Sequence, residues 1–233
     1  MSNTDTYIAD NIKRIRETIG EAAIKSGRVS EDVKLVAASK TKPAAYINQA
    51  IAAGVDAVGE NRVQEMLEKR EQGAYEGAPL HFIGHLQSNK VSKIVGVCDL
   101  IESVSSASLI EAIGKRAVSL GIEQKVLIEI NVGKEPQKSG VLPEQADEVL
   151  ALASQTKGIK VLGLMAIPPF FEDGDTDRYY FDIMFKLFVD MSAKKYDNVS
   201  VQFLSMGMSD SYVDAIRAGS NMVRIGSALF GGR

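Results

Sequence analysis

The chain has 233 residues, of which 45% are apolar and 24% charged, and its formal charge at pH 7 is −3. This is the composition of an ordinary globular protein long enough for one complete α/β barrel, and the slight negative charge gives no reason to expect nucleic acid or an anionic membrane as a partner. Cys98 is the single cysteine, which excludes an internal disulfide and fits a reducing, cytoplasmic environment.

The N-terminal segment predicts an amphipathic helix over residues 4–26. Four isoleucines between residues 8 and 19 recur at spacings of four and three, which places them on one helix face. The first seven residues contain no basic segment and no long apolar run, so we expect neither a signal peptide nor a membrane helix. The two histidines, His81 and His85, do not form a zinc-type spacing with Cys98, and no metal site is expected.

From residue 34 onward, short apolar runs alternate with helical stretches. Strands are predicted near 34–39, 57–59, 81–84, 100–104, 125–132, 159–165, 200–205 and 222–225. Helices are predicted between them, near 43–53, 61–71, 88–96, 106–120, 143–156, 177–195 and 210–218. Parallel strands need crossover helices, so this alternation predicts an α/β protein in which residues 1–233 form a single (β/α)8 TIM barrel, with a doubly wound open sheet as the alternative.

Two segments depart from the regular alternation. No long helix follows the eighth strand, and we expect the extra N-terminal helix to cover the resulting gap in the outer ring. Residues 168–176 carry two prolines and an acidic run, which predicts a mobile surface loop. Whether that loop closes over a site as a lid is left open.

The loops after the last two predicted strands have the composition of a phosphate site. In barrels of this kind, phosphate often binds after strands seven and eight. The seventh strand runs into Ser205-Met206-Gly207-Met208-Ser209, and the eighth into Gly226-Ser227-Ala228. Small residues let backbone N–H groups approach an anion, and a following helix N-terminus adds positive partial charge. Each loop alone is more simply an ordinary turn, but the pair predicts a phosphate site.

Lys40 ends the first predicted strand, where alternation gives it the direction of Val36 and Ala38. Because the first strand of a closed barrel neighbours the eighth, Lys40 would lie beside the two loops. An amine next to a phosphate site suits a phosphate ligand with a carbonyl group, and pyridoxal 5′-phosphate (PLP) is a ligand that forms a Schiff base with lysine. The amine must be neutral to react, which nearby cations such as Lys42 and Arg224 would favour. The alternative is a solvated loop lysine.

Alternation also directs Arg224 into the barrel, because Val223 and Ile225 face the helices. An unpaired guanidinium would be costly there, and the pyridine nitrogen of PLP is one possible acceptor. Contact with a permanently charged arginine would keep that nitrogen unprotonated and weaken the cofactor as an electron sink. The alternative is a salt bridge to a barrel carboxylate, for which Glu129 is the first candidate.

Seven strings along the chain resemble those of the PLP homeostasis proteins, which are PLP-binding barrels similar to the N-terminal domain of alanine racemase. They are V-A-A-S-K-T-K-P (36–43), G-E-N-R-V-Q-E (59–65), H-F-I-G-H-L-Q-S-N-K (81–90), E-P-Q-K-S-G (135–140), G-L-M-A-I-P-P (163–169), S-M-G-M-S-D (205–210) and V-R-I-G-S-A-L-F-G (223–231). Two positions depart from the family pattern, since Ser211 stands where an acidic residue is usual and Arg62 where tyrosine is commoner.

The resemblance implies a role for particular residues. Lys40 would be the Schiff-base lysine, and Arg224 would contact the ring nitrogen. The remaining cofactor-binding positions that it implies are Ser205, Gly207, Ser209, Gly226 and Ser227 at the phosphate, with Asn61, His85 and Met165 lining the same mouth. Lys138 matches the lysine of the family's E-P-x-K-S-G loop. Two interpretations of Lys138 stay equally open: it meets an incoming anion, or it is a solvated loop lysine.

The resemblance implies a cytoplasmic protein of vitamin B6 homeostasis that binds PLP reversibly and delivers it to apo-enzymes without strong catalysis of its own. The main alternative is a PLP-dependent amino-acid enzyme of the racemase type, and a phosphosugar barrel that uses Lys40 for aldol chemistry is a weaker one. Racemases of this class use a second, β-rich domain that supplies a tyrosine base and closes a dimeric site. Because this sequence ends just after the barrel, we expect no such domain, a monomer, and poor proton abstraction.

Overall fold

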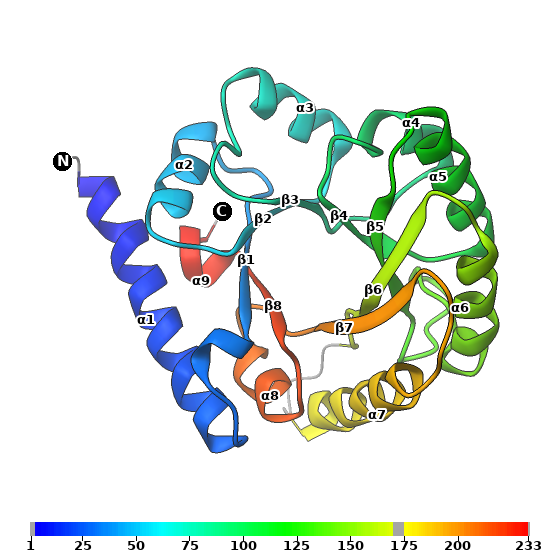
Figure 1. Ribbon diagram of the computed structural model, residues 1–233. Helices are drawn as coiled ribbons and strands as arrows, with labels where there is room; N and C mark the ends of the chain where they lie inside the picture. The colour runs from blue at the N-terminus through cyan, green and yellow to red at the C-terminus, as the bar shows by residue number, and fades with distance from the viewer. Residues whose placement is uncertain (1–2, 170–174, 233) are drawn as a thin grey trace.

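The computed structural model describes residues 3–169 and 175–232. Within them, eight parallel strands pair in chain order and close into a barrel, which confirms the predicted barrel and excludes the open sheet. Figure 1 shows the ring of strands with the helices outside it. The strands are β1 (Lys34–Ala38), β2 (Ala57–Glu60), β3 (Leu80–Phe82), β4 (Leu100–Val104), β5 (Gln124–Ile130), β6 (Ile159–Ala166), β7 (Val199–Ser205) and β8 (Met222–Ile225).

The helices follow the predicted order, with short turns of 3-10 helix among them. The α-helices are α1 (Asn3–Lys25), α2 (Ala44–Ala52), α3 (Val63–Glu71), α4 (Val91–Ile94), α5 (Ala107–Ser119), α6 (Ala146–Gln155), α7 (Asp175–Ser192), α8 (Tyr212–Arg217) and α9 (Ser227–Phe230). The 3-10 turns are η1 (Ser30–Asp32), η2 (Ser88–Lys90) and η3 (Pro143–Gln145). None of the described helices is both long and apolar enough to cross a bilayer.

The helix predicted near residues 88–96 is the largest departure. It is a 3-10 turn followed by the four-residue helix α4, which stops before Gly96 at a φ of 80°. Left-handed backbone of this kind ends a helix, and glycine adopts it without steric cost. The loop predicted at 168–176 falls largely on residues 170–174, which lie outside the described residues.

Helix α1 completes the outer ring, as expected. It packs against α2, α8 and α9 (Figure 1), and its isoleucine stripe is buried. Asn11 on the same helix donates from Nδ2 to the carbonyl of Leu229 in α9 at 2.9 Å. The N-terminal helix therefore covers the gap left by the short α9.

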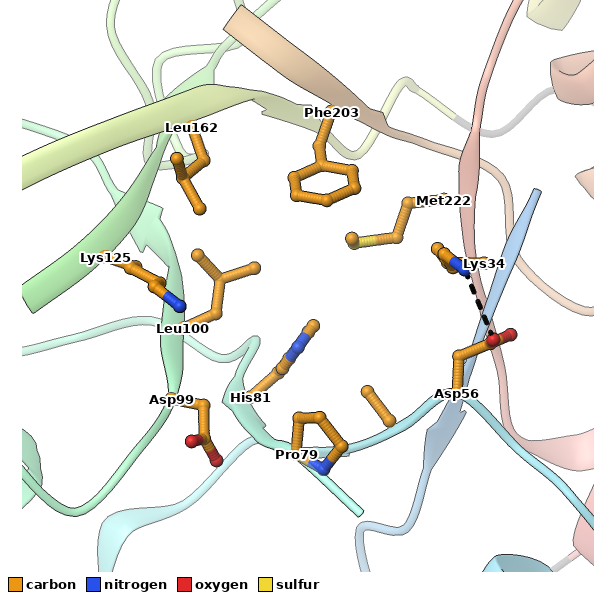
Figure 2. Close-up of a pocket in the computed structure, with 11 residues that line it drawn as sticks. Lys34, Asp56, Pro79, His81, Asp99, Leu100, Lys125, Leu162, Phe203 and Met222 are labelled. Atoms are coloured by element: carbon orange, nitrogen blue, oxygen red, sulfur yellow. Dashed lines mark ion pairs between the residues drawn. The ribbon is translucent and has the colours of Figure 1, made fainter. Parts of the chain in front are cut away.

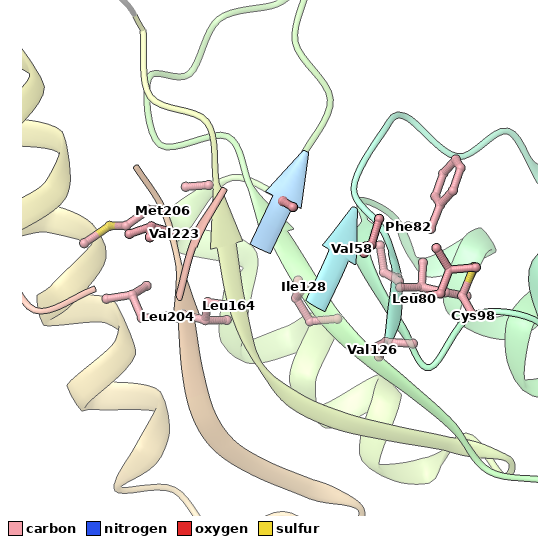
Figure 3. Close-up of a cluster of buried hydrophobic side chains, with 14 of the residues drawn as sticks. Val58, Leu80, Phe82, Cys98, Val126, Ile128, Leu164, Leu204, Met206 and Val223 are labelled. Carbon is pink, nitrogen blue, oxygen red and sulfur yellow. The ribbon is translucent and has the colours of Figure 1, made fainter. Parts of the chain in front are cut away.

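Alternation along each strand produces two apolar layers. Outward side chains such as Val58, Ile128 and Val223 pack between barrel and helices (Figure 3). Inward side chains form a separate inner cluster, which comprises Val36, Ala57, Leu100, Leu127, Met165 and Met222. The inward direction of Val36, and the outward direction of its neighbours Leu35 and Ala37, match the alternation from which the position of Lys40 was predicted.

The barrel closes where β1 pairs with β8, with Val36 opposite Arg224. Basic side chains add contacts across this seam. Lys42 donates from Nζ to the carbonyls of Gly231 and Gly232 at 3.2 and 3.0 Å, and Arg28 donates to the carbonyl of Ser220 at 2.8 Å. Segments from opposite ends of the sequence are thus joined at both ends of β1, by Arg28 at its amino end and by Lys42 beyond its carboxyl end.

Candidate functional site

Lys40 and the two predicted phosphate loops meet at the carboxyl end of the barrel. The β1–β8 register brings Gly226 so close to β1 that a Cβ on Gly226 would lie 3.1 Å from the carbonyl oxygen of Ala38. Lys40 follows Ala38 by two residues, and its side chain is exposed. Among the described residues no hydrogen bond or ion pair involves its amine, so that amine is available to a ligand.

Side chains from α3 hold the backbone on both sides of Lys40. Lys69 donates from Nζ to the carbonyl of Ser39 at 2.8 Å, and the carboxylate of Glu65 accepts from the N–H of Thr41. Thr41 has a φ of 66°, a conformation that β-branched residues rarely adopt and that surrounding contacts must maintain. These two bonds therefore fix the turn that presents Lys40.

We call Ser39, Glu60, Glu65, Lys69 and Tyr75 the Lys69 network. The amine of Lys69 lies 2.8 Å from Glu60 and 2.7 Å from Glu65. Glu60 Oε1 also accepts from the hydroxyls of Ser39 at 2.6 Å and Tyr75 at 3.0 Å. Burial, and then the neighbouring Glu60 carboxylate, raise the pKa of Tyr75 and keep its phenol protonated as a donor. The network is on the outer side of the strands, so it positions Lys40 without entering the mouth.

Arg224 points into the barrel, as predicted, and is only 4% exposed. It donates from Nη2 to the carbonyl of Ala166 at 2.9 Å and from Nη1 to the hydroxyl of Ser205. Its nearest carboxylate is Glu102 on β4, at 3.8 Å. Among the described residues no ion pair joins it to Glu129, the carboxylate considered from the sequence, so the salt-bridge partner was misassigned.

Glu102 is fully buried and serves several partners at once. Its Oε1 accepts from Nδ1 of His81 at 2.7 Å, and its Oε2 accepts from the Ser205 hydroxyl at 2.6 Å. Burial opposes ionisation, but the hydrogen bond and charge of His81, followed by Arg224 and Ser205, hold the pKa of Glu102 below its usual value. A polar chain of His81, Glu102, Ser205 and Arg224 therefore crosses the barrel interior with an ionised carboxylate at its centre.

The two predicted phosphate loops contact each other directly. The Ser209 hydroxyl oxygen accepts from the N–H groups of Gly226 and Ala228 at 3.3 and 3.2 Å. Gly207 has a φ of 96°, and a Cβ there would lie only 2.6 Å from the Cβ of Ala215. Glycine is thus required for α8 to approach this loop. Ser227 is exposed at the start of α9, so both loops converge on one patch of backbone donors and hydroxyls.

A hollow of about 210 Å³ lies across the mouth, between the ends of β2, β3 and β5. Asn61 lines it with a buried Oδ1 that has no hydrogen-bond partner. His85 lines it with Nδ1 at 2.7 Å from the Ser139 hydroxyl. Lys138 also lines it, with its amine 2.5 Å from the Glu135 carboxylate. The structure therefore brings Asn61, His85 and Lys138 together at the mouth.

Three residues differ in setting from what the sequence analysis implied. Met165 is fully buried in the inner cluster, beneath the mouth. Ser205 is also fully buried, with its hydroxyl engaged by Glu102 and Arg224. Glu129 lines the hollow with an unpartnered Oε2, and burial raises its pKa while Arg224 acts in the opposite direction. Glu129 is thus a mouth carboxylate whose pKa lies above its usual value.

The chain is similar to proteins of one family along almost its whole length. Residues 6–233 match the family described as alanine racemase, N-terminal domain. The chain is 42% identical to the pyridoxal phosphate homeostasis protein of Aquifex aeolicus, over 96% of this chain and 97% of the relative. It is 37% identical to the protein of the same name from Escherichia coli K12, over 97% of both chains.

Solved structures agree with these matches. An unknown protein from Bifidobacterium adolescentis has a TM-score of 0.93 and 36% identity, covering 99% of this chain and 97% of the other. PipY of Synechococcus elongatus with PLP bound has a TM-score of 0.82 and 31% identity, covering 96% and 100%. An alanine racemase of Clostridium difficile has a TM-score of 0.71 at 17% identity, and this chain covers 57% of it, a likeness of fold alone.

Replacing Lys69 by methionine should destabilise the protein by about 3–5 kcal/mol, because it leaves the buried Glu60 and the adjacent Glu65 without their cation. Urea unfolding measures this. The control is Arg217→Ala, which breaks an exposed pair with Asp214 and should cost less than about 1 kcal/mol. Equal losses in the two variants would contradict the structural role of the Lys69 network.

Proposed function

The chain belongs to the family of pyridoxal phosphate homeostasis proteins, and we propose that it holds PLP as a Schiff base on Lys40 at the carboxyl end of its barrel. The observation that carries this proposal is the β1–β8 pairing, which brings the Gly226 loop against Ala38, two residues before Lys40. The Lys40 side chain is exposed, and its amine has no partner among the described residues. PipY, at 31% identity, has a solved structure with PLP bound. The homeostasis proteins of Aquifex aeolicus and Escherichia coli carry PLP in their names.

The residues at the mouth fit the three functional parts of PLP. Lys40 offers an amine for the aldehyde, and Arg224 lines the mouth together with Gly207 and Met208, where it can meet the ring nitrogen. The phosphate fits the two converging loops, where backbone donors of Gly226 and Ala228 already point at one oxygen atom. When bound, PLP supplies an aldehyde that condenses with amines and a ring that withdraws electrons.

We assign the phosphate to Gly207, Ser209, Gly226 and Ser227. A phosphate oxygen would accept from the same N–H groups that now donate to Ser209, and anions are favoured where several backbone donors converge. Ser205 takes a different role in this assignment. Since its hydroxyl donates to Glu102 and accepts from Arg224, it orients the guanidinium. Asn61 and His85 line the other side of the mouth, above the packed Met165.

Arg224 supports a carrier more than a catalyst. Its neighbour Glu102 is ionised, and arginine stays protonated at any ordinary pH. Such a donor beside the pyridine nitrogen of bound PLP would leave that nitrogen unprotonated, which would weaken the withdrawal of electrons on which racemisation depends. The chain also spans 97% of the length of the homeostasis protein of Aquifex aeolicus. We infer a cytoplasmic, monomeric protein that stores PLP reversibly and delivers it to apo-enzymes.

Replacing Lys40 by alanine should abolish the visible absorbance of the Schiff base, because Lys40 is the lysine that follows the end of β1, against which the Gly226 loop packs. The fold should persist by circular dichroism, since Lys40 is exposed. Borohydride reduction followed by peptide mapping identifies the modified lysine. Lys42→Ala is the matched control and should retain the absorbance. A Schiff base that survives in Lys40→Ala would move the attachment to another lysine.

Replacing Arg224 by glutamine should weaken PLP binding at least about tenfold and also destabilise the barrel by about 3–5 kcal/mol, because Glu102 loses its buried partner. The double variant Arg224→Gln/Glu102→Gln removes both charges. It should recover part of the stability but none of the PLP affinity. Absorbance titration and urea unfolding separate the two effects. Unchanged PLP affinity in the single variant would show that Arg224 serves the fold alone.

The carrier and racemase functions are distinguished by turnover. The PLP-loaded protein, incubated with L-alanine or D-alanine, should show spectral exchange with the amino acid but no sustained racemisation, for the reason given for Arg224. Chiral chromatography of the amino acid measures the outcome. Continued racemisation at a rate proportional to protein concentration, and lost in Lys40→Ala, would overturn the carrier assignment in favour of a PLP enzyme.

A further inference from the structure

A second cavity, of about 300 Å³, lies at the opposite end of the barrel, where the strands begin. Figure 2 shows its lining side chains arranged around the open space. Lys34 opens β1 at this end, whereas Lys40 follows the other end of the same strand, so the cavity is separate from the proposed PLP site. We propose that it binds a small organic carboxylate with an apolar or aromatic body.

The walls of the cavity are apolar. Leu100 and Met222 belong to the inner cluster, and Leu162 and Phe203 pack against it from the same side. In Figure 2 these four side chains point toward the centre of the cavity. Ligand pockets typically have volumes of about 300–1,000 Å³ and mostly apolar walls with a few polar groups. This cavity is at the small end of that range, which suits a single ring or a branched chain.

His81 presents a polar atom to the cavity. Its side chain is 8% exposed, and in Figure 2 its ring points into the space between Leu100 and Met222. Nδ1 is engaged by the ionised Glu102 at 2.7 Å, which leaves Nε2 for an occupant, since no hydrogen bond of Nε2 occurs among the described residues. A carboxyl head of the occupant at Nε2 could share one proton with the imidazole, which would join the two by a hydrogen bond.

The acidic residues at this end are already engaged. Asp56 accepts from the N–H of Leu35 at 2.7 Å and from Arg16 at 2.7 Å. Asp99 accepts from the N–H of Leu80 at 2.7 Å. Both carboxylates therefore anchor the first residues of strands, and the cation at Arg16 offsets the charge of Asp56. They leave little negative charge to repel an anion.

The lysines at the rim have more freedom. Lys34 is 3.7 Å from Asp56, a long contact for an ion pair, and the exposed Lys125 has no ion pair among the described residues. Together with Arg16 these give three cations against the two carboxylates of the rim. The rim cations and His81 thus favour an occupant with an anionic head. The apolar walls favour an occupant with an apolar body.

Benzoate is the test ligand, with benzamide as its neutral counterpart. Isothermal titration of the purified full chain should give saturable binding of one benzoate per chain, and benzamide should bind more weakly. Lys125→Ala should weaken benzoate binding at least fivefold, and Lys125→Arg should restore it. Lys115→Ala, an exposed lysine on α5, should have no effect. Lys125 and Lys115 are both solvent-exposed, so neither variant endangers the fold.

The same titration separates this site from the mouth at Lys40. Lys40→Ala should bind benzoate like the unaltered protein, whatever its ability to hold PLP. No saturable binding of benzoate at millimolar concentration would overturn the proposal. Binding that is lost in Lys40→Ala but unchanged in Lys125→Ala would assign benzoate to the mouth and would equally overturn it.

Discussion

A positive charge buried inside the barrel constrains much of its interior. The guanidinium of Arg224 is removed from water, and a buried charge is tolerated only with an ionised partner and hydrogen bonds to its remaining donors. Glu102 supplies the opposite charge at 3.8 Å, and Ser205 and the carbonyl of Ala166 take individual donors. His81 then satisfies the second oxygen of Glu102. The need to compensate the charge of one arginine thereby accounts for the buried polar residues His81 on β3, Glu102 on β4 and Ser205 on β7.

Much of the barrel follows from patterns visible in the sequence. The strands appear as short apolar runs, and parity along β1 and β8 directs Val36 and Arg224 inward. The partner of Arg224 could not be chosen in the same way. By alternation, the side chains of Glu102 and Glu129 both point into the barrel. Which of them pairs with Arg224 depends on how far β4 and β5 are staggered relative to β8. Alternation from the inward Leu100 would have shown that Glu102 points inward.

The Lys69 network was missed for a different reason. Glu65 and Lys69 have the spacing of an ordinary exposed helix pair, and nothing local distinguishes them from one. Their importance arises because α3 packs over the ends of β1 and β2, where Glu60 is buried. The turn at Lys40 is thus fixed from outside the barrel, while the Lys40 side chain remains exposed. The ion pairs that support this turn belong to Lys69, and Lys40 itself forms none among the described residues.

The β1–β8 seam has a consequence for synthesis of the protein. Lys40 leaves the ribosome roughly 180 residues before β8, an interval of roughly 10–40 s at about 5–20 residues per second. Until β8 arrives, the nascent chain has neither Arg224 nor the Gly226 loop beside Lys40, and that amine is no different from any other lysine. With the proposed attachment at Lys40, selective loading with an aldehyde would therefore be post-translational, and a truncated chain that lacks β8 would have no means of discriminating among its amines.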